Sequence, residues 1–547
     1  MLLILLALAW LAWPGDVAAQ PKTVCSITVN SPDEQETFRR SLRADKFQFV
    51  ELVEHGRPDW LASACRRQIR CDVLVISGHY DGANVFFSDR PVASEFLPVD
   101  EMERVSCSDS CPGLFSQLKE VYLFGCNTLN PGANRNVSAE IERSLVRSGH
   151  SPADAERLAR VLGKRHGESS RDRMRLIFKD VPAIYGFSSV APLGPAAAAI
   201  LARHFQVDGT NDVGSGRPSA RLLGQFGGHA MVVAGGLKDA DPQAAYRKDI
   251  CQFVDDRLSA AQKLDFVHRL LAREMAEVRM FFDSIEEYFA SVPESEWQAP
   301  AFARALDDVA RDRVVRDRYL DFARDADHPS IRARMMKLAR KLGWLSATEL
   351  QDELAQMIRE MLARDAVDAA DLDLVCLLAD AHELNPELSR LQMPPEQEGK
   401  TGHAAVLACL GNAEAHARVL GALTSGNDGD VELAQVYLYH RPITEVNELR
   451  VVSKAIAEMN GSPAQIRAID ALARLRLSDR RSLEEMIRLY SQTERADVQM
   501  AIARLLIRAD STMFATSELV EALHQSRLKS QPGEDPIDVL IRRLQTP

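Results

Sequence analysis

Short apolar runs alternate with helix-like segments along the first 240 residues. The apolar runs are five to eight residues long, as is typical of strands, and polar helix starts follow the first two of them. The third run is continuously apolar, which predicts a strand buried on both faces. This alternation favours a mostly parallel sheet flanked by helices, an α/β fold. The predicted strands are residues 24–30, 47–54, 73–77, 120–125, 183–187 and 230–236.

Beyond about residue 249 the strand signals end and the chain becomes a succession of helical patterns rich in Ala, Leu and Arg. Four similar windows begin at Ile331, Val431, Ile466 and Val498, each after a short polar or proline-containing turn. The last two intervals are 35 and 32 residues, and the first, of 100 residues, is close to three such steps. These units resemble HEAT repeats, which implies an all-α solenoid, and an unrelated helical bundle is the alternative.

The length requires more than one structural unit, because single hydrophobic cores stop growing at roughly 250–300 residues and this chain has 547. We predict an α/β domain over residues 20–245, a helical connector over 246–325 and the helical repeats over 326–547. A content of 46% hydrophobic and 26% charged residues excludes a disordered chain. The net charge of −12 provides no electrostatic footprint for nucleic acid, so we expect no nucleic-acid partner.

The first twenty residues have the pattern of a secretory signal. An apolar run over residues 2–13 precedes Pro14-Gly15 and a small-residue site at 17–19, which predicts a signal peptide over residues 1–19. A membrane anchor is the alternative, but this run is shorter than the roughly twenty residues that span a bilayer. No later run is longer, so we expect no stable membrane insertion and an exported protein, periplasmic or secreted.

Nine cysteines, an odd number, leave at least one thiol unpaired within the chain. Disulfides persist in exported proteins, so we expect bridges among five cysteines of the first domain, with the connectivity left open. Cys107 and Cys111 could instead form half of a metal site, but no second ligand pair accompanies them. We expect burial in equivalent repeat positions for Cys376 and Cys409. The five candidate disulfide cysteines are Cys25, Cys65, Cys71, Cys107 and Cys111.

Two strand ends carry chemistry. The third predicted strand runs into Gly78-His79 and the fourth into Gly125-Cys126. The carboxyl ends of parallel strands share one edge of a sheet, so His79 and Cys126 can meet there if the strands are neighbours. A thiolate is a nucleophile, and an imidazole can take its proton and later protonate a leaving amine. The alternatives are a small buried cysteine and a hydrogen-bonded turn histidine.

These segments resemble the caspase-like cysteine peptidases, which include caspases, gingipains, clostripain, separase and CHAT domains. In that clan a His follows the third strand and a Cys the fourth, and here they are 47 residues apart, near the caspase spacing of about 50. Residues 183–205 resemble the CHAT strand, loop and Ala-rich helix that line the groove. Two positions differ: Tyr80 replaces a common Gly, and Phe124-Gly125 replace an acidic residue found in members specific for basic side chains.

The resemblance implies a cysteine endopeptidase with a Cys126/His79 dyad acting on a protein or peptide, and helical repeats that bind substrates or partner proteins. The alternative is an inactive caspase-like domain that serves, with the repeats, as an interaction scaffold. We predict no cofactor and no metal site. No calcium loop is recognisable in the sequence, but calcium activates part of the clan, so the resemblance leaves calcium activation open. The oxyanion and substrate-groove candidates are Gly78, Tyr80, Gly125, Asn127, Phe187, Ser188 and Ser189.

Overall fold

The computed structural model of the chain divides into two compact units. The first extends to Val315 and the second begins at Arg316. The structure describes residues 20–57, 59–82, 85–88, 95–107, 111, 113–132, 138–147, 149–165, 169–255, 257–326, 328–392, 395–397, 399–460, 463–475, 477–510, 516–528 and 535–545. The predicted signal peptide lies outside these residues, and the finer predicted divisions at residues 245 and 325 stay predictions.

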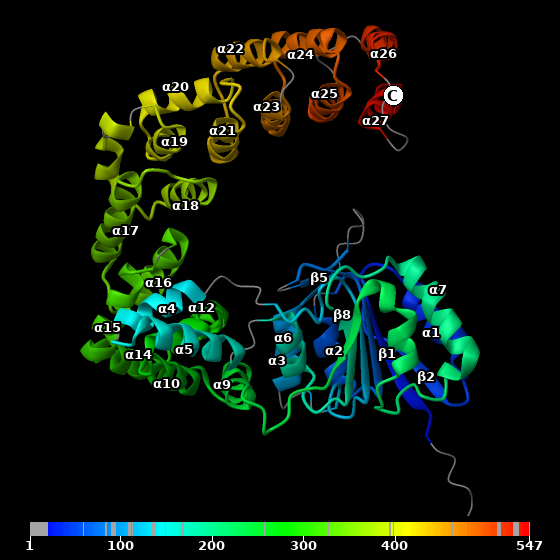
Figure 1. The fold of residues 1–547 in the computed structure, drawn as a ribbon. Helices are drawn as coiled ribbons and strands as arrows, with labels where there is room; N and C mark the ends of the chain where they lie inside the picture. The colour runs from blue at the N-terminus through cyan, green and yellow to red at the C-terminus, as the bar shows by residue number, and fades with distance from the viewer. Residues whose placement is uncertain are drawn as a thin grey trace, which may run out of the picture. The chain divides into compact units, whose positions relative to one another are not determined.

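A six-stranded, mostly parallel sheet forms the centre of the first unit (Figure 1). The strand order is β2-β1-β3-β7-β8-β9, and every neighbouring pair is parallel except β8 and β9. This arrangement confirms the predicted mostly parallel α/β sheet, with the last strand reversed. The strands are β1 (Lys22–Thr28), β2 (Phe47–Glu51), β3 (Val73–Ser77), β7 (Glu120–Phe124), β8 (Ala183–Phe187) and β9 (Met231–Ala234).

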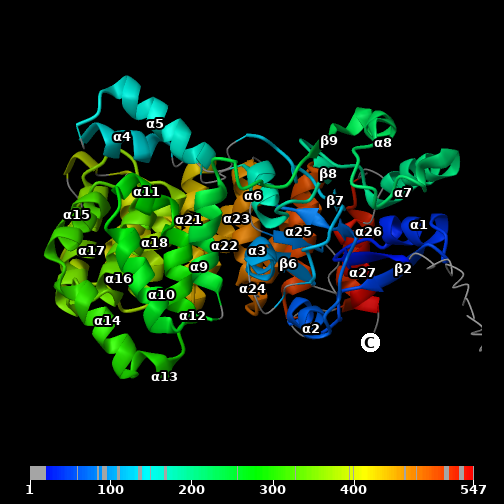
Figure 2. The same cartoon turned by 90° about the horizontal axis from the view of Figure 1, so that it is seen from below.

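Helices cover both faces of this sheet (Figure 2). Helices α1 (Asp33–Ser41) and α7 (Gly194–His204) pack on one face, and α2 (Trp60–Arg66), α3 (Val99–Cys107) and α6 (Ser170–Ile177) on the other. Successive residues of the central strands therefore enter two different cores, which explains why β3, β7 and β8 are buried along their whole length.

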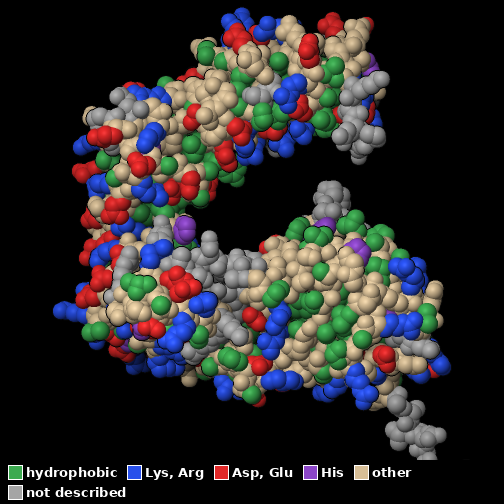
Figure 3. Space-filling view, in the orientation of Figure 1, with side chains coloured by type: hydrophobic (Ala, Val, Ile, Leu, Met, Phe, Trp, Pro, Cys, Tyr) green, Lys and Arg blue, Asp and Glu red, His purple; other side chains and the backbone are tan. Residues whose placement is uncertain are grey.

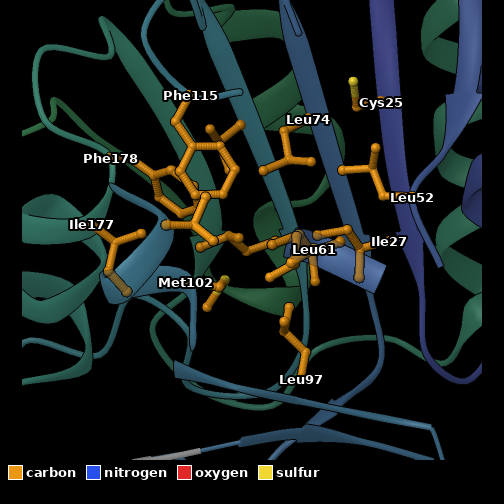
Figure 4. Packing of buried hydrophobic residues seen from close by; sticks show 14 of the residues in the cluster. Cys25, Ile27, Leu52, Leu61, Leu74, Leu97, Met102, Phe115, Ile177 and Phe178 are labelled. Carbon is orange, nitrogen blue, oxygen red and sulfur yellow. The ribbon is translucent and has the colours of Figure 1, made fainter. Parts of the chain in front are cut away.

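The core on the side of α2 and α3 shows how the apolar runs are used. Figure 4 shows Ile27 and Leu74 of the sheet facing Leu61 and Met102 of these helices. Burial of each such side chain contributes roughly 1.5–3 kcal/mol, so the strand pattern read from the sequence is also the main source of stability.

A second, three-stranded antiparallel sheet extends from the end of β3. It comprises β4 (His79–Tyr80), β5 (Val85–Phe87) and β6 (Phe96–Pro98), in that order. Tyr80, Phe86 and Leu97 are buried in the same core as α2 and α3. Strands of two or three residues have no readable periodicity, so the sequence analysis did not predict this sheet.

Eight of the nine cysteines are paired. The bridges are Cys25–Cys71, Cys65–Cys111, Cys107–Cys251 and Cys376–Cys409. Disulfides therefore join the five candidates, as expected, but Cys107 pairs with Cys251 rather than with Cys111. Cys376 and Cys409 are buried, as expected, but they also form a disulfide that was not predicted, because α18 (Ala369–Asp380) and α19 (Thr401–Cys409) place the two side chains against each other.

A buried carboxylate closes the amino end of the large sheet. Glu120, the first residue of β7, accepts hydrogen bonds from the amides of Gly214, Ser215 and Gly216 at 2.9, 3.1 and 3.0 Å. The Tyr122 hydroxyl donates to the same carboxylate at 2.7 Å. Burial, and secondarily the Glu120 charge, raise the pKa of Tyr122 well above its ordinary value. Glu120 therefore ties the loop before α8 (Ala220–Gln225) to the sheet.

Six helices that follow the sheet belong to the first unit. They are α9 (Ala244–Val254), α10 (Ala260–Leu271), α11 (Met275–Met280), α12 (Phe282–Ser291), α13 (Glu294–Trp297) and α14 (Pro300–Arg311). Arg247 of α9 donates to the Leu176 carbonyl and to both oxygens of Ser106 on α3. The Cys107–Cys251 bridge joins the same two helices, so α9 is fastened to the α/β layer by covalent and hydrogen bonds.

Two further helices lie between β7 and β8. Helices α4 (Ser138–Arg147) and α5 (Pro152–Arg165) pack against each other through Ile141, Leu145 and Ala155. Ala276 of α11 belongs to the same small core, so this pair extends from the sheet to the helical part of its own unit.

The second unit is helical, as expected, and stacks helices in two layers. In Figure 1, α21 (Asp428–His440), α23 (Pro463–Arg474), α25 (Ala496–Arg508) and α27 (Pro536–Gln545) form one layer, and α22 (Val446–Ala457), α24 (Arg480–Gln492) and α26 (Thr516–Gln525) form the other. The remaining helices of this unit are α15 (Arg313–Arg324, which spans the boundary), α16 (Pro329–Lys341), α17 (Ala347–Leu362), α18, α19 and α20 (Ala413–Ala422), with the short η3 (Pro386–Arg390) and η4 (Pro395–Gln397).

A buried glutamine recurs along this stack. The Gln465 amide donates to the carbonyls of Ile456 and Met459, and the Gln499 amide to those of Tyr490 and Ser526. The two glutamines are 34 residues apart, and each holds the carbonyl nine residues before it. The interval between the two glutamines is two residues longer than the 32-residue interval between the windows at Ile466 and Val498. The resemblance to HEAT repeats stays a prediction.

Candidate active site

Neighbouring parallel strands bring His79 and Cys126 to one edge of the large sheet. Ser77, the last residue of β3, is the register partner of Phe124, the last residue of β7. The Gly78 amide donates to the Phe124 carbonyl at 3.2 Å, so the register continues one residue beyond the strands. His79 and Cys126 each follow this pair by two residues, and both are half-buried. The condition set by the sequence, that the two strands be neighbours, is met.

His79 is held by the small sheet rather than by a free loop. It lies in β4 as the register partner of Phe87 in β5, and the centroids of the two rings are 5.5 Å apart. The Asp81 carboxylate accepts the Val85 amide at 3.1 Å, a hydrogen bond within the hairpin of β4 and β5. The position of the imidazole is therefore fixed by strand pairing and ring packing.

Cys126 is the one cysteine without a disulfide partner. The Ala191 amide, in the loop after β8, donates to its Sγ at 3.4 Å. An N–H donor interacts more strongly with a charged acceptor than with a neutral one, so this amide is oriented to interact with a thiolate. The sequence did not predict the contact from Ala191, because a backbone N–H is common to all residues except proline and leaves no pattern in the sequence.

The turn that carries Cys126 is anchored to β8. Asn127 has φ of 59°, in the left-handed region that Asn adopts more readily than most residues. Its amide donates to the Ser189 carbonyl at 2.7 Å, and the Leu129 amide donates to the Phe187 carbonyl at 2.9 Å. Backbone hydrogen bonds therefore hold the turn after Cys126 to the loop whose Ala191 amide contacts the sulfur.

Gly125 permits a close approach within the protein itself. A Cβ at this position would lie 2.9 Å from the Tyr80 Cβ and 3.0 Å from the Gly78 carbonyl oxygen. A side chain there would force the β4 segment away from the end of β7. The glycine therefore allows the His-bearing and Cys-bearing segments to lie against each other, in addition to any role in admitting a substrate.

The remaining groove candidates surround this turn with different degrees of exposure. Phe187 and Tyr80 are buried, and Ser189 is exposed. The Ser188 amide and hydroxyl both donate to the Ala230 carbonyl. The amides of Gly78, Asn127 and Ser188 therefore already donate to backbone carbonyls, and the Asp81 amide likewise donates to the Val85 carbonyl. An oxyanion would need other donors, and the Cys126 amide is the candidate on the turn itself.

A buried acid that the sequence analysis did not select lies at the same end of the sheet. Glu34, at the start of α1, is 3% exposed, and burial raises the pKa of its carboxyl to about 7. Neither the Ser77 hydroxyl oxygen nor the Glu34 Oε2 has a hydrogen-bond partner among the described residues. The carboxyl end of the sheet thus contains buried polar atoms without hydrogen-bond partners among the described residues.

Two further observations bear on partners. In the described part of the chain, no group of three or more His, Cys, Asp or Glu residues is arranged to hold a metal ion. None of its helices combines the length and the apolarity that crossing a membrane requires.

The chain was also compared with known proteins. No family model, no curated protein and no solved structure matches it.

Proposed function

We propose that this chain is an exported cysteine endopeptidase of the caspase-like type, with Cys126 as nucleophile and His79 as general base and acid. The observation that supports the proposal is the pairing of β3 with β7, because the segments that carry His79 and the chain's unpaired cysteine follow these two strands at the same edge of the sheet. The four disulfides fit an oxidising environment, in keeping with export.

The proposed chemistry is acyl transfer in two steps. His79 takes the thiol proton, the Cys126 thiolate attacks the peptide carbonyl, and the developing oxyanion is held by the amides of Cys126 and of a residue near His79. The C–N bond breaks as the imidazolium protonates the leaving amine. Water, deprotonated by His79, then hydrolyses the thioester and restores the thiol. The helical unit would bind substrates or partner proteins.

A non-catalytic scaffold is the second candidate. It is favoured by the amides of Gly78, Asn127 and Ser188, which already donate to backbone carbonyls and so reduce the donors available for an oxyanion. In that case the sheet edge and the helical unit are both binding surfaces, and Cys126 is an unpaired thiol without enhanced reactivity.

Thiol labelling separates the two candidates. Residues 20–547, with disulfides formed, are treated with iodoacetamide and with a peptidyl acyloxymethyl ketone, and modified sites are quantified by mass spectrometry. A peptidase is labelled at Cys126 by the ketone, and His79→Ala slows that labelling at least tenfold. The matched control is His55→Ala, since His55 is exposed and lies outside the site; it should label at the native rate. Equal, slow labelling of native and His79→Ala proteins would reject the peptidase.

A further inference from the structure

The small sheet has two faces of opposite character, and the outward face begins at His79. Register pairs cross the three strands in two rows: Tyr80, Phe86 and Leu97 form one, and His79, Phe87 and Phe96 the other. Cross-strand partners lie on the same face of a sheet. The first row is buried in the core of the first unit. The second row therefore faces away from that core.

Two aromatic side chains in the outward row are exposed. Phe87 is 37% exposed and Phe96 is 60% exposed, although the solvent face of such a sheet is ordinarily polar. Phe87 supports His79 by ring packing, whereas Phe96, on the edge strand β6, has its ring largely in solvent. The row thus continues outward from the proposed catalytic histidine as an aromatic surface.

The loop on the other side of Cys126 is also apolar. Val190 is 70% exposed and Leu193 is 73% exposed, and they flank the Ala191 amide that contacts the sulfur. Figure 3 shows hydrophobic side chains gathered at this end of the sheet, over the region of β5 and β8. The proposed nucleophile is therefore bordered on two sides by exposed apolar groups.

The nearby acids do not form a comparable surface for a basic side chain. Asp33 accepts a hydrogen bond from the Ser31 hydroxyl, and Glu34 is buried with its pKa raised to about 7 by that burial. Asp81 is exposed near His79, and its carboxylate accepts the Val85 amide. The exposed side chains of Phe87, Phe96, Val190 and Leu193 offer a ligand apolar contact.

We propose that the outward row of the small sheet selects peptide substrates with a large apolar or aromatic side chain beside the scissile bond. This specificity rests on the proposed function. Phe96 contacts that side chain, Phe87 contacts it while supporting His79, and Val190 and Leu193 border the same substrate across Cys126. When a substrate binds, the exposed side chains of Phe96, Val190 and Leu193 become buried against it. Removing this apolar surface from water supplies the selectivity.

The test compares cleavage rates for quenched peptides in which one position near the cleaved bond is Phe, Leu, Ala, Arg or Asp. The native protein should prefer Phe or Leu over Ala by at least tenfold in kcat/KM. Phe96→Ser should reduce that preference about tenfold, because cleavage of the Phe and Leu peptides slows more than cleavage of the Ala peptide. Val207→Ser is the matched control, because Val207 is an exposed apolar residue of the same unit outside this surface; it should leave the preference unchanged.

The two proposals fail in distinguishable ways. If iodoacetamide labels Cys126 at a rate that does not depend on His79, the peptidase proposal is overturned. If Cys126 labelling depends on His79 and peptides are cleaved, but Arg or Asp is preferred or Phe96→Ser slows all peptides equally, the specificity proposal alone is overturned.

Discussion

The two ends of the large sheet use their polar groups in opposite ways. At the amino end, Glu120 receives five hydrogen bonds, from the Tyr122 hydroxyl, three amides and the Ser215 hydroxyl. At the carboxyl end, Cys126 keeps its thiol, and Glu34 keeps a buried oxygen without a partner among the described residues. Buried polar groups with hydrogen-bond partners stabilise the fold. Buried polar groups without partners lower stability, and they are retained where chemistry or binding needs them. The amino end is thus a structural end, and the carboxyl end is the functional end that we propose.

The largest effect is expected at the functional end. Cys126→Ser should lower peptide cleavage at least ~10³-fold, because a hydroxyl replaces the only proposed nucleophile. Measurement of kcat/KM checks this, and thiol titration of the native chain should fall from one free thiol to none. The free energy of unfolding should change little. Cleavage at the native rate in Cys126→Ser would contradict the assignment of this end.

At the structural end, Glu120→Ala should destabilise the first unit by about 3–5 kcal/mol, because three amides and a buried hydroxyl lose their acceptor. Urea unfolding followed by fluorescence measures the change. Glu36→Ala is the matched control, since Glu36 forms only an exposed ion pair with Arg40, and should cost less than about 1 kcal/mol. Similar losses for the two variants would remove the contrast between the ends.

Glu34 makes the functional end sensitive to pH. Its folded pKa of about 7 lies above its ordinary value of 4.5, so between these values the folded chain binds more protons than the unfolded chain. The resulting stability is fully present below pH 4.5, falls by about 3 kcal/mol as pH rises towards 7, and is absent above it.

Unfolding free energies at several pH values test this dependence. Glu34→Gln should flatten the decline between pH 4.5 and 7, and Glu36→Gln, on the same helix with its side chain 47% exposed, should keep it. A decline of native size in Glu34→Gln would assign it to other groups.

The smallest expected effect concerns the contact between the segments that carry His79 and Cys126. Gly125→Ala should cost about 1–3 kcal/mol and lower cleavage, because the new methyl meets Tyr80 and the Gly78 carbonyl. Gly224→Ala, in α8 with open space around it, is the control and should be neutral or stabilising. Equal stability of the two variants, measured by thermal unfolding, would show that the segments adjust to each other.

The sequence predicted the features that depend on long apolar runs. Strand β3, buried on both faces, and the edge position of His79 and Cys126 follow from such runs and from the geometry of parallel strands. The reversed direction of β9 has no signature in its own text, because an apolar run does not encode its polarity. The small sheet was not predicted, because its strands are too short to show an alternation of polar and apolar residues. The aromatic row that begins at His79 was therefore not predicted either.

The sequence also could not predict contacts between residues that lie far apart in the chain. Cys251 lies in helical text 144 residues from Cys107, and the acceptor role of Glu120 depends on amides nearly a hundred residues later. Such pairings arise from tertiary packing, whereas pattern reading detects neighbours within one element.

The disulfides of the first unit overlap along the chain. The bridge from Cys25 reaches Cys71, the next starts at Cys65 and ends at Cys111, and the third starts at Cys107 and ends at Cys251. Each loop begins before the previous one closes, so any single backbone cut between Cys25 and Cys251 leaves its two pieces covalently joined. A nicked molecule would keep its full mass on a non-reducing gel and separate into fragments only after reduction.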